Sequence, residues 1–249
     1  MRLFFLLVTI AFTATAQTEK PVVYYVGNMG VAIVKNDSVI LIDALHDYYD
    51  VYYSPTDPEV LKKLNIREKP FRKLVAITAT HMHNDHFDET LITQLSQNLS
   101  PVKVVMGKQP AEQLPKVAKG SLQVVDQKGT VKLSDQLSIS FLNVGHTGGN
   151  RNGYIENYRI EIKWGQYRFV HFGDAAPSAK TFEGLQPGAD VAIIPYWFCL
   201  DENDIRLLES QKFKSVIATH IDPRGVSKFA KTNFEVVPFK TYGQQFTVK

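Results

Sequence analysis

The stretch THMHNDHFD, residues 80–88, decides how the rest of this sequence is interpreted. It holds three of the chain's seven histidines and an aspartate, in the pattern His-x-His-x-Asp-His. Imidazole nitrogens and carboxylate oxygens are the usual ligands of zinc where no thiolate is available. Residues two apart point the same way in an extended chain, so His81 and His83 can bind one cation together. Asp85 and His86 follow where the chain turns and can bind another. The spacing therefore predicts a site for two metal ions.

The segments on either side place this motif in a loop between a strand and a helix. KLVAITAT, residues 73–80, is an apolar run typical of a buried strand. Asp88 is expected to cap a helix in which Leu91, Leu95 and Leu99 recur at helical spacing. Loops at strand ends carry sites in layered α/β folds, so the position agrees with a functional role.

The remaining pattern predicts one α/β domain without internal repeats. Strands are expected within residues 22–26, 30–34, 38–43 and 101–107, through a β-rich middle at 121–174, and within 189–195 and 214–220, with a strand pair at the C-terminus. Helices are expected after Asp57-Pro58, across 109–118 and over about 201–211.

Three later residues complete a possible ligand set, and each follows a predicted strand. His146 comes after LSISFLNV and stands among glycines, in NVGHTGGN. Asp174 follows RFVHFG, where a carboxylate can bridge two cations, and His220 ends SVIATH. Three histidines with a bridging carboxylate would serve one ion, and two carboxylates with two histidines would serve the other.

With these residues together, the sequence resembles the metallo-β-lactamase superfamily. The resemblance covers essentially the whole chain after the leader and implies an αββα sandwich of two mixed β-sheets flanked by helices. It assigns Asp43, in VILIDA, a role in supporting the metal loop. The implied ligands are His81, His83 and His146 for the first metal, Asp85, His86 and His220 for the second, and Asp174 as the bridge.

Within the superfamily, the stretches GNMGVAIVKNDSVILIDA, THMHNDHFD, HFGDA and ADVAIIP are similar to the branch of ascorbate-phosphate lactonase-like metal-dependent hydrolases. The implied function is a binuclear zinc hydrolase, in which a metal-bridging hydroxide attacks an ester, lactone or phosphoester, with Asp85 and Asp174 as catalytic carboxylates. Mn²⁺ or Fe is compatible with the same ligands, so an iron-loaded oxidoreductase is one alternative. A class B-like β-lactamase is another, which Asp174 disfavours because the three-histidine and cysteine types lack a bridging aspartate there. A non-enzymatic metal binder ranks last because all seven positions are filled.

Several residues outside this set could contact a small-molecule substrate. Tyr196, Trp197 and Phe198 follow the strand ADVAIIP, where they either line the site or pack. Asn150 and Arg151, after His146, either orient an anionic group or form a solvated turn. His46 either lines the pocket mouth or lies on a solvated loop, and the tyrosine-rich run at 47–55 could form a wall or lid.

Two further residues are expected to have structural roles. His171, three positions before Asp174, is interpreted as a packing residue or an outer partner of the ligands. Cys199 is the only cysteine, so no intramolecular disulfide is possible, and we expect it to be a small buried hydrophobic residue.

The N-terminus and the composition predict where the protein acts. MRLFFLLVTIAFTATAQ has one basic residue, a short apolar run and a small-x-small site, so residues 1–16 are predicted to be a cleaved signal peptide and 17–249 a single domain. We expect a periplasmic or secreted protein without stable membrane insertion after cleavage. The net charge is +3 with no dense basic block, which disfavours nucleic acid as a partner.

Overall fold

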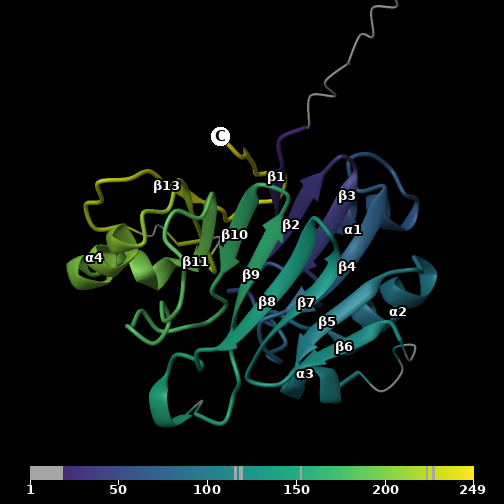
Figure 1. Ribbon diagram of the computed structural model, residues 1–249, viewed down its shortest axis with the longest axis horizontal. Helices are drawn as coiled ribbons and strands as arrows, with labels where there is room; N and C mark the ends of the chain where they lie inside the picture. The colour runs from purple at the N-terminus through teal and green to yellow at the C-terminus, as the bar shows by residue number, and fades with distance from the viewer. Residues whose placement is uncertain (1–18, 115–116, 118–119, 152, 223, 226–227) are drawn as a thin grey trace, which may run out of the picture.

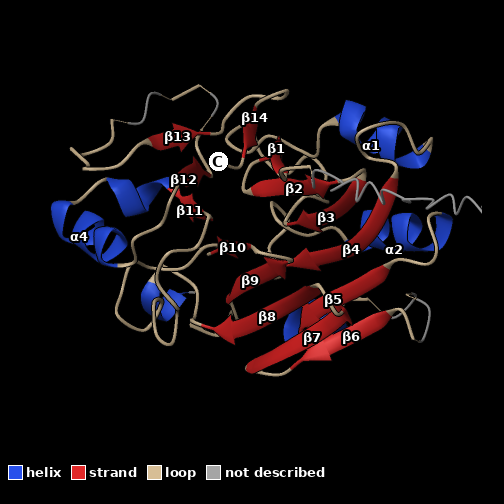
Figure 2. Cartoon of the chain, turned by 45° about the horizontal axis from the view of Figure 1, so that its top comes forward, coloured by secondary structure: helices blue, strands red, loops and turns tan. Residues whose placement is uncertain are grey.

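The structure is a computed structural model and describes residues 19–114, 117, 120–151, 153–222, 224–225 and 228–249. Two seven-stranded mixed sheets pack face to face, and the helices cover their outer faces (Figures 1 and 2). The predicted αββα sandwich is therefore confirmed. The predicted signal peptide, residues 1–16, lies outside the described residues.

The first sheet begins as the predicted antiparallel meander and continues with parallel strands. Its order is β14-β1-β2-β3-β4-β5-β6. β1 to β3 pair antiparallel through short turns, whereas β3, β4, β5 and β6 are parallel neighbours joined by helical crossovers. The strands are β1 (Val22–Gly27), β2 (Gly30–Lys35), β3 (Ser38–Ile42), β4 (Lys73–Ala79), β5 (Lys103–Gly107), β6 (Leu122–Val125) and β14 (Gln245–Thr247).

The second sheet has the order β13-β12-β11-β10-β9-β8-β7. β7 to β10 pair antiparallel, and β10 to β13 are parallel. Exposed and partly buried residues alternate along β7, as expected for an edge strand with one face in solvent. The strands are β7 (Lys128–Ser134), β8 (Leu137–Asn143), β9 (Tyr158–Trp164), β10 (Tyr167–His171), β11 (Val191–Pro195), β12 (Val216–Thr219) and β13 (Val236–Pro238).

The helices begin at residues that satisfy their free backbone N–H groups. Asp57 accepts a hydrogen bond from the Glu59 amide at 2.9 Å, and Asp88 accepts one from the Leu91 amide at 2.7 Å, so both predicted helix starts are confirmed. Figure 1 shows α1, α2 and α3 beside the first sheet and α4 beside the second. The helices are α1 (Pro58–Asn65), α2 (Glu89–Asn98), α3 (Lys108–Glu112) and α4 (Glu202–Ser210), with short 3-10 turns η1 (Gly149–Arg151) and η2 (Tyr196–Cys199).

Three buried layers hold the sandwich together. The central layer lies between the sheets and includes Ile33 and Ile42 from the first sheet with Ile160 and Ile193 from the second. A second layer joins the first sheet to α1, α2 and α3, and a third joins the second sheet to η2 and α4. The central strands of each sheet are therefore buried on both faces, which explains the continuous apolar runs in β2, β3 and β11.

Two expectations from the sequence are wrong. Of the helix predicted across 109–118, only the part up to Glu112 forms, in α3; residues 113 and 114 are not helical, in keeping with the proline that follows them in sequence, and residues 115–116 and 118 lie outside the described residues. The predicted C-terminal strand pair does not form, since β13 joins the second sheet and β14 pairs with β1 of the first. Between them Phe239 enters the central layer, so the chain crosses from one sheet to the other. Within the described residues, no helix has the length and apolar character needed to span a bilayer.

The sandwich brings several strand ends to one edge. β3 and β4 of the first sheet end just before Asp43 and His81. β8, β10 and β12 of the second sheet end just before the segments that carry His146, Asp174 and His220. Residues separated by more than a hundred positions therefore meet at this edge.

Candidate metal centre

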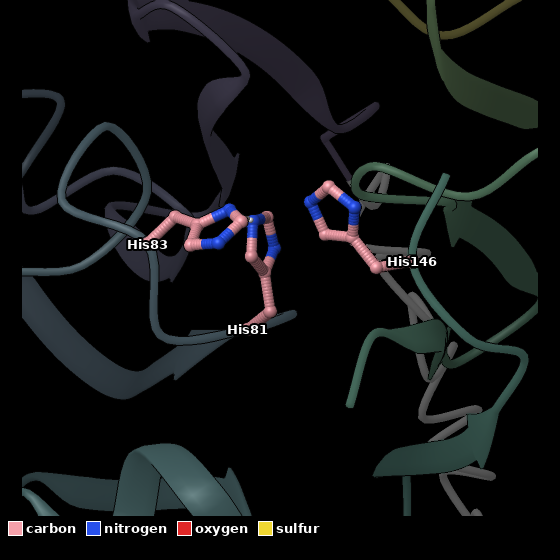
Figure 3. Close-up of side chains that lie close together, drawn as sticks. All are labelled: His81, His83 and His146. Atoms are coloured by element: carbon pink, nitrogen blue, oxygen red, sulfur yellow. Dashed lines mark hydrogen bonds between the residues drawn. The ribbon is translucent and has the colours of Figure 1, made fainter. Parts of the chain in front are cut away.

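The first group of side chains, which we name cluster one, is His81, His83 and His146. One ring nitrogen from each lies within 4.8 Å of the others. His81 Nε2 is 3.1 Å from His83 Nδ1, and the ring centroids of His83 and His146 are 4.7 Å apart. Figure 3 shows the three imidazoles converging, with His81 and His83 from the loop after β4 and His146 from a different segment.

The second group, cluster two, is Asp85, His86 and His220, and again one ligand atom from each lies within 4.8 Å of the others. Asp85 Oδ2 is 3.2 Å from His220 Nε2 and 3.5 Å from His86 Nε2. All three residues are buried, whereas His83 and His146 of cluster one are partly exposed. The two triads are the same sets that the family resemblance implied.

Asp174 lies between the clusters and contacts both. Its Oδ2 is 3.5 Å from His146 Nε2 of cluster one and 3.5 Å from His220 Nε2 of cluster two. Its Oδ1 is 3.3 Å from His86 Nε2, and Asp174 also forms a close group with His81 and His86. One carboxylate therefore joins all the histidine-bearing segments of the site.

Outer hydrogen bonds fix which ring nitrogen of His81, His86 and His146 faces the centre. His86 Nδ1 is 2.9 Å from Asp43 Oδ2, so it donates its proton outward and turns Nε2 inward. The Thr80 hydroxyl donates to Asp43 Oδ2 at 2.7 Å and lies 3.0 Å from His81 Nδ1, which orients His81 in the same way. His146 Nδ1 is 2.5 Å from its neighbour's carbonyl, Thr147 O. Asp43 thus supports the motif loop without belonging to either triad, as the resemblance implied.

The position of Asp174 depends on close packing of its backbone. Its amide donates to Asn157 Oδ1 at 3.0 Å. Gly173 has φ +53°, and a Cβ there would lie 2.4 Å from Asn157 Oδ1 and from Thr80 Oγ1. Glycine is therefore required at 173, both for its left-handed backbone and for the space.

Burial and the carboxylates divide the histidines into two classes. Burial lowers the pKa of His81 and His83, and the neighbouring histidine charges add to this effect. Burial acts in the same direction on His86 and His220, but there the carboxylates outweigh it. Asp174 and Asp85 hold the pKa of His86 well above its usual value and raise that of His220 to about 9.

The carboxylates themselves shift in the opposite sense. Burial alone would raise the pKa of Asp174, but His220 and His86 hold it well below its usual range. Burial also opposes the shift at Asp85, where His86 and the hydrogen bond from His220 lower the pKa. Both carboxylates are therefore ionised at neutral pH and carry negative charge into the centre.

The arrangement passes a simple test for cation binding. Three buried atoms, His86 Nε2, His220 Nε2 and Asp174 Oδ1, make no well-formed hydrogen bond among the described residues, and their contacts with the opposite charges of the site are 3.2 to 3.5 Å long. Buried polar atoms are rarely left without one, because the desolvation cost is then uncompensated. Nitrogen and carboxylate oxygen converging on one space are also the donors that zinc and iron accept. The residues present therefore fit two cations.

An open pocket of about 480 Å³ leads to the centre. Its lining includes His83, Asp85, His146, Asp174 and His220, so members of both clusters reach it. Tyr49 and Tyr53 from the tyrosine-rich run also line it, and the Tyr53 ring stands edge-on to His220 at 5.3 Å between centroids. Tyrosine side chains offer apolar area and a polar tip, which suits contact with a small organic molecule.

The substrate-contact candidates from the sequence take other places. His46 is 1% exposed and does not line this pocket; burial lowers its pKa to about 4. Trp197 packs edge-on against His220 at 5.1 Å and donates its indole N–H to Ala175 O, and Tyr196 packs on Trp197. These aromatic residues support the His220 side of the centre from outside the pocket.

The remaining substrate-contact candidates from the sequence are Asn150, Arg151 and Phe198. Arg151 is exposed in η1 and does not line the pocket, and the side chain of Asn150 lies outside the described residues. Phe198 is fully buried in the layer under α4, together with Cys199, whose pKa burial raises to about 12. The prediction that Cys199 is a buried hydrophobic residue is confirmed.

His171 also has the structural role expected of it. The buried ring accepts a hydrogen bond from the Gly173 amide at Nδ1 and lies 3.1 Å from Met29 O at Nε2. Since Nδ1 accepts, Nε2 carries the proton and donates to that carbonyl. His171 therefore links the turn after β1 to the Asp174 loop and belongs to neither cluster.

Two residues at the centre were missed by the sequence analysis. Asn157 holds the Asp174 amide, and Asn28 donates from Nδ2 to Asp85 Oδ2 at 3.0 Å. Asparagine is common in turns, so neither residue carries a local signal of its own. The segment Gly-Asn-Met-Gly around Asn28, between two predicted strands, indicated a tight turn and nothing more.

Comparison with known proteins agrees with this geometry. The family model described as "Beta-lactamase superfamily domain" matches residues 38–233. No curated protein matches the sequence. The metallo-β-lactamase fold protein YhfI from Bacillus subtilis is 18% identical with a TM-score of 0.62, over 92% of this chain and 99% of that chain.

Two further solved structures share the fold. Igni18, a metallo hydrolase from Ignicoccus hospitalis, is 17% identical with a TM-score of 0.62, over 92% of this chain and 100% of that one. CmlA, a diiron β-hydroxylase from Streptomyces venezuelae, is 16% identical with a TM-score of 0.54, over 81% of this chain and 45% of that one. The match to the family model covers most of the sequence, including the motif of residues 80–88, Asp174 and His220. This chain belongs to the β-lactamase superfamily and has the metallo-β-lactamase fold.

Proposed function

We propose that this protein is an exported metal-dependent hydrolase that uses two zinc ions to cleave an ester, lactone or phosphoester in a small molecule. The observation that carries the proposal is the position of Asp174, whose two carboxylate oxygens face His86, His146 and His220 at 3.3 to 3.5 Å. A carboxylate between two histidine clusters is what a bridged pair of cations requires. Family membership supports the same reading.

Each cluster would hold one cation. His81, His83 and His146 would bind the first, Asp85, His86 and His220 the second, and Asp174 would contact both. When bound, such a pair of cations lowers the pKa of a shared water and polarises the group under attack. Zinc suits the imidazole and carboxylate donors, although Mn²⁺ or Fe fits them as well.

The protein's own groups would perform the remaining tasks. Asp85 and Asp174 are ionised, and in this proposal one of their carboxylate oxygens accepts the proton that the attacking water loses. Asp43 and Thr80 keep the imidazoles oriented through their outer hydrogen bonds. Tyr49 and Tyr53 would contact the organic part of the substrate along the pocket wall.

Two other activities use the same fold. An iron-loaded oxidoreductase is compatible with the donor set, and the fold similarity to CmlA, described as a diiron β-hydroxylase, is the observation in its favour. A β-lactamase is less favoured because Asp174 stands where the three-histidine and cysteine types lack a bridging aspartate. The proposed location is periplasmic or secreted, with a small-molecule substrate and neither nucleic acid nor membrane as partner; the sequence of residues 1–16 supports export.

The test combines metal removal with a substrate panel. Metal-free protein is assayed against a lactone, a carboxylic ester, a phosphodiester and a β-lactam, before and after addition of Zn²⁺, Mn²⁺ or Fe²⁺. We expect zinc to restore hydrolysis of at least one of the first three substrates. Activity that persists without metal, or turnover of the β-lactam alone, contradicts the proposal. Metal analysis of the freshly purified protein that finds iron without zinc favours the oxidoreductase.

A further inference from the structure

The turn between β1 and β2 contacts cluster two through Asn28. The Asn28 side chain is 1% exposed and donates two hydrogen bonds from Nδ2 to Asp85, one to the backbone carbonyl at 3.1 Å and one to Oδ2 at 3.0 Å. The two residues are 57 positions apart in sequence. One amide therefore fixes both the backbone and the carboxylate of Asp85.

The bonded oxygen is the one that faces the cluster. Asp85 Oδ2 is also 3.2 Å from His220 Nε2 and 3.5 Å from His86 Nε2. A carboxylate oxygen has two lone pairs, so an amide donor on one side leaves the other available. The Asn28 contact thus selects Oδ2 as the inward atom and sets the direction of its free lone pair.

The same residue holds a second member of cluster two through its backbone. The His220 amide donates to Asn28 O at 3.2 Å. His220 has φ +58°, in the left-handed region that residues other than glycine seldom adopt. Such a conformation persists only where surrounding contacts hold it, and the bond to Asn28 is one of them. Asn28 therefore connects two of the three residues in cluster two.

The turn is itself held firmly in place. Asn28 has φ +43°, which asparagine tolerates better than most residues. A Cβ at Gly30 would lie 2.5 Å from Asp43 O, so the chain after the turn runs directly against the residue that orients His86. Met29 O accepts a hydrogen bond from His171 Nε2 at 3.1 Å. The turn and Asp43 thus form one support beneath cluster two.

We propose that Asn28 is a positioning residue for the second cation, acting through the Asp85 carboxylate and the His220 backbone. This inference rests on the proposed function, because it needs a cation at cluster two. Cluster one has no hydrogen bond to Asn28 among the described contacts, so the effect is confined to one of the two cations. Loss of an outer hydrogen-bond partner typically weakens metal binding by about 10- to 100-fold.

The test is zinc titration of the metal-free Asn28→Gly variant. Glycine keeps the positive φ and the Asn28 backbone carbonyl, and it removes only the amide. We expect the first zinc to bind as in the wild type and the second to bind about 10- to 100-fold more weakly. Asn36→Gly is the matched control, since Asn36 has φ +50° in the exposed turn between β2 and β3. It should leave both affinities unchanged.

Two further measurements assign the effect to cluster two. His220→Ala should abolish the second zinc, and adding Asn28→Gly in that background should change the remaining zinc affinity little. Unchanged binding of the second zinc in Asn28→Gly overturns the inference. An equal loss of both zincs also overturns it, because that result indicates a general effect on folding. A wild-type chain that binds fewer than two zincs contradicts the proposed function itself.

Discussion

Clusters one and two contain three ligating residues each, yet they are built in different ways. Cluster one is three histidines whose rings lie near the open pocket, with His83 and His146 partly exposed. The three residues of cluster two are all classed as buried, although Asp85 and His220 reach the pocket, and the cluster includes the carboxylate of Asp85. Burial lowers the pKa of His81 and His83, whereas the carboxylates raise the pKa of His86 and His220.

This difference implies two modes of cation binding. In the metal-free protein at neutral pH, His81 and His83 are neutral and can accept a cation directly. His86 and His220 are protonated and ion-paired with Asp85 and Asp174, so a cation must displace their protons. Cluster one therefore resembles an open site, and cluster two a closed network in which protons substitute for the metal.

The largest expected effect comes from the residue that the clusters share. Asp174→Ala removes the carboxylate next to both, so we expect weaker binding of both zincs, by more than the ~100-fold that loss of an outer partner costs. Hydrolytic activity should fall with the bound zinc. Equilibrium dialysis followed by metal analysis measures this effect. Retention of two tightly bound zincs would show that Asp174 does not bridge the clusters.

Single-cluster variants should separate the two sites. His83→Ala removes a ligand of cluster one only, and His220→Ala removes a ligand of cluster two only. We expect each variant to bind one zinc per chain in place of two, with thermal unfolding of the metal-free His83→Ala protein close to that of the wild type. Metal analysis with mass spectrometry counts the zincs. If either variant loses both zincs, the clusters are not independent.

A smaller effect is expected from pH, and it should be stronger for the zinc of cluster two than for the zinc of cluster one. The pKa of His220 is raised from 6.5 to about 9, so protons compete with the second zinc up to that range. The affinity of the second zinc should rise as pH increases from about 6 to about 9, while that of the first changes less. Calorimetric titration in buffers of different ionisation enthalpy measures the protons released. Equal proton release by both zincs would contradict the comparison.

The same shift gives the metal-free protein a pH-dependent stability. Because the folded-state pKa of His220 is above the unfolded value, its ion pairs contribute stability that is fully present below about pH 6.5. That contribution is lost as the pH rises through about 9. The thermal midpoint of metal-free protein should therefore decline over this interval, and bound zinc should remove the decline. Replacing His220 by alanine is the control, since it removes one of the two histidines with a raised pKa and should make the decline smaller.

The smallest effect is expected from the tyrosines that line the pocket beside both clusters, where the substrate would bind. Tyr53→Ala should raise KM by about threefold to tenfold, the size of a lost aromatic contact, with a smaller change in kcat. Tyr154→Ala is the control, because that side chain is 71% exposed and does not line the pocket. Steady-state kinetics on whichever substrate the panel identifies provides the measurement. Equal changes in the two variants would remove Tyr53 from the binding wall.

The residues that meet in the two clusters could be predicted from the sequence, because the motif concentrates four of them in one loop. His146, Asp174 and His220 were also found, since each follows an apolar run and matches a position of the family pattern. Asn28 could not be found, because its amide meets Asp85 only after the two sheets have packed. A Gly-Asn turn is compatible with a simple hairpin, and the pattern gives no sign of the distant partner.

The errors in the fold have a similar cause. β13 and β14 are three residues each, so local pattern says little about their partners, and packing of Phe239 between the sheets decides the pairing. His46 and Trp197 lie near the centre but do not line the pocket. The direction of a side chain at a strand end depends on contacts made across the sandwich, and the local sequence does not show those contacts. Residue type identified the chemistry, and long-range packing determined which residues face the substrate.

The central claim is that one carboxylate joins two separate cation sites. It is tested most directly by native mass spectrometry of the wild-type chain and of Asp174→Ala, both loaded with zinc and then exposed to the same weak chelator. We predict two zincs per chain in the wild type, and loss of both in the variant under conditions that leave the wild type fully loaded. A single zinc in the wild type, or two retained zincs in Asp174→Ala, would contradict the account.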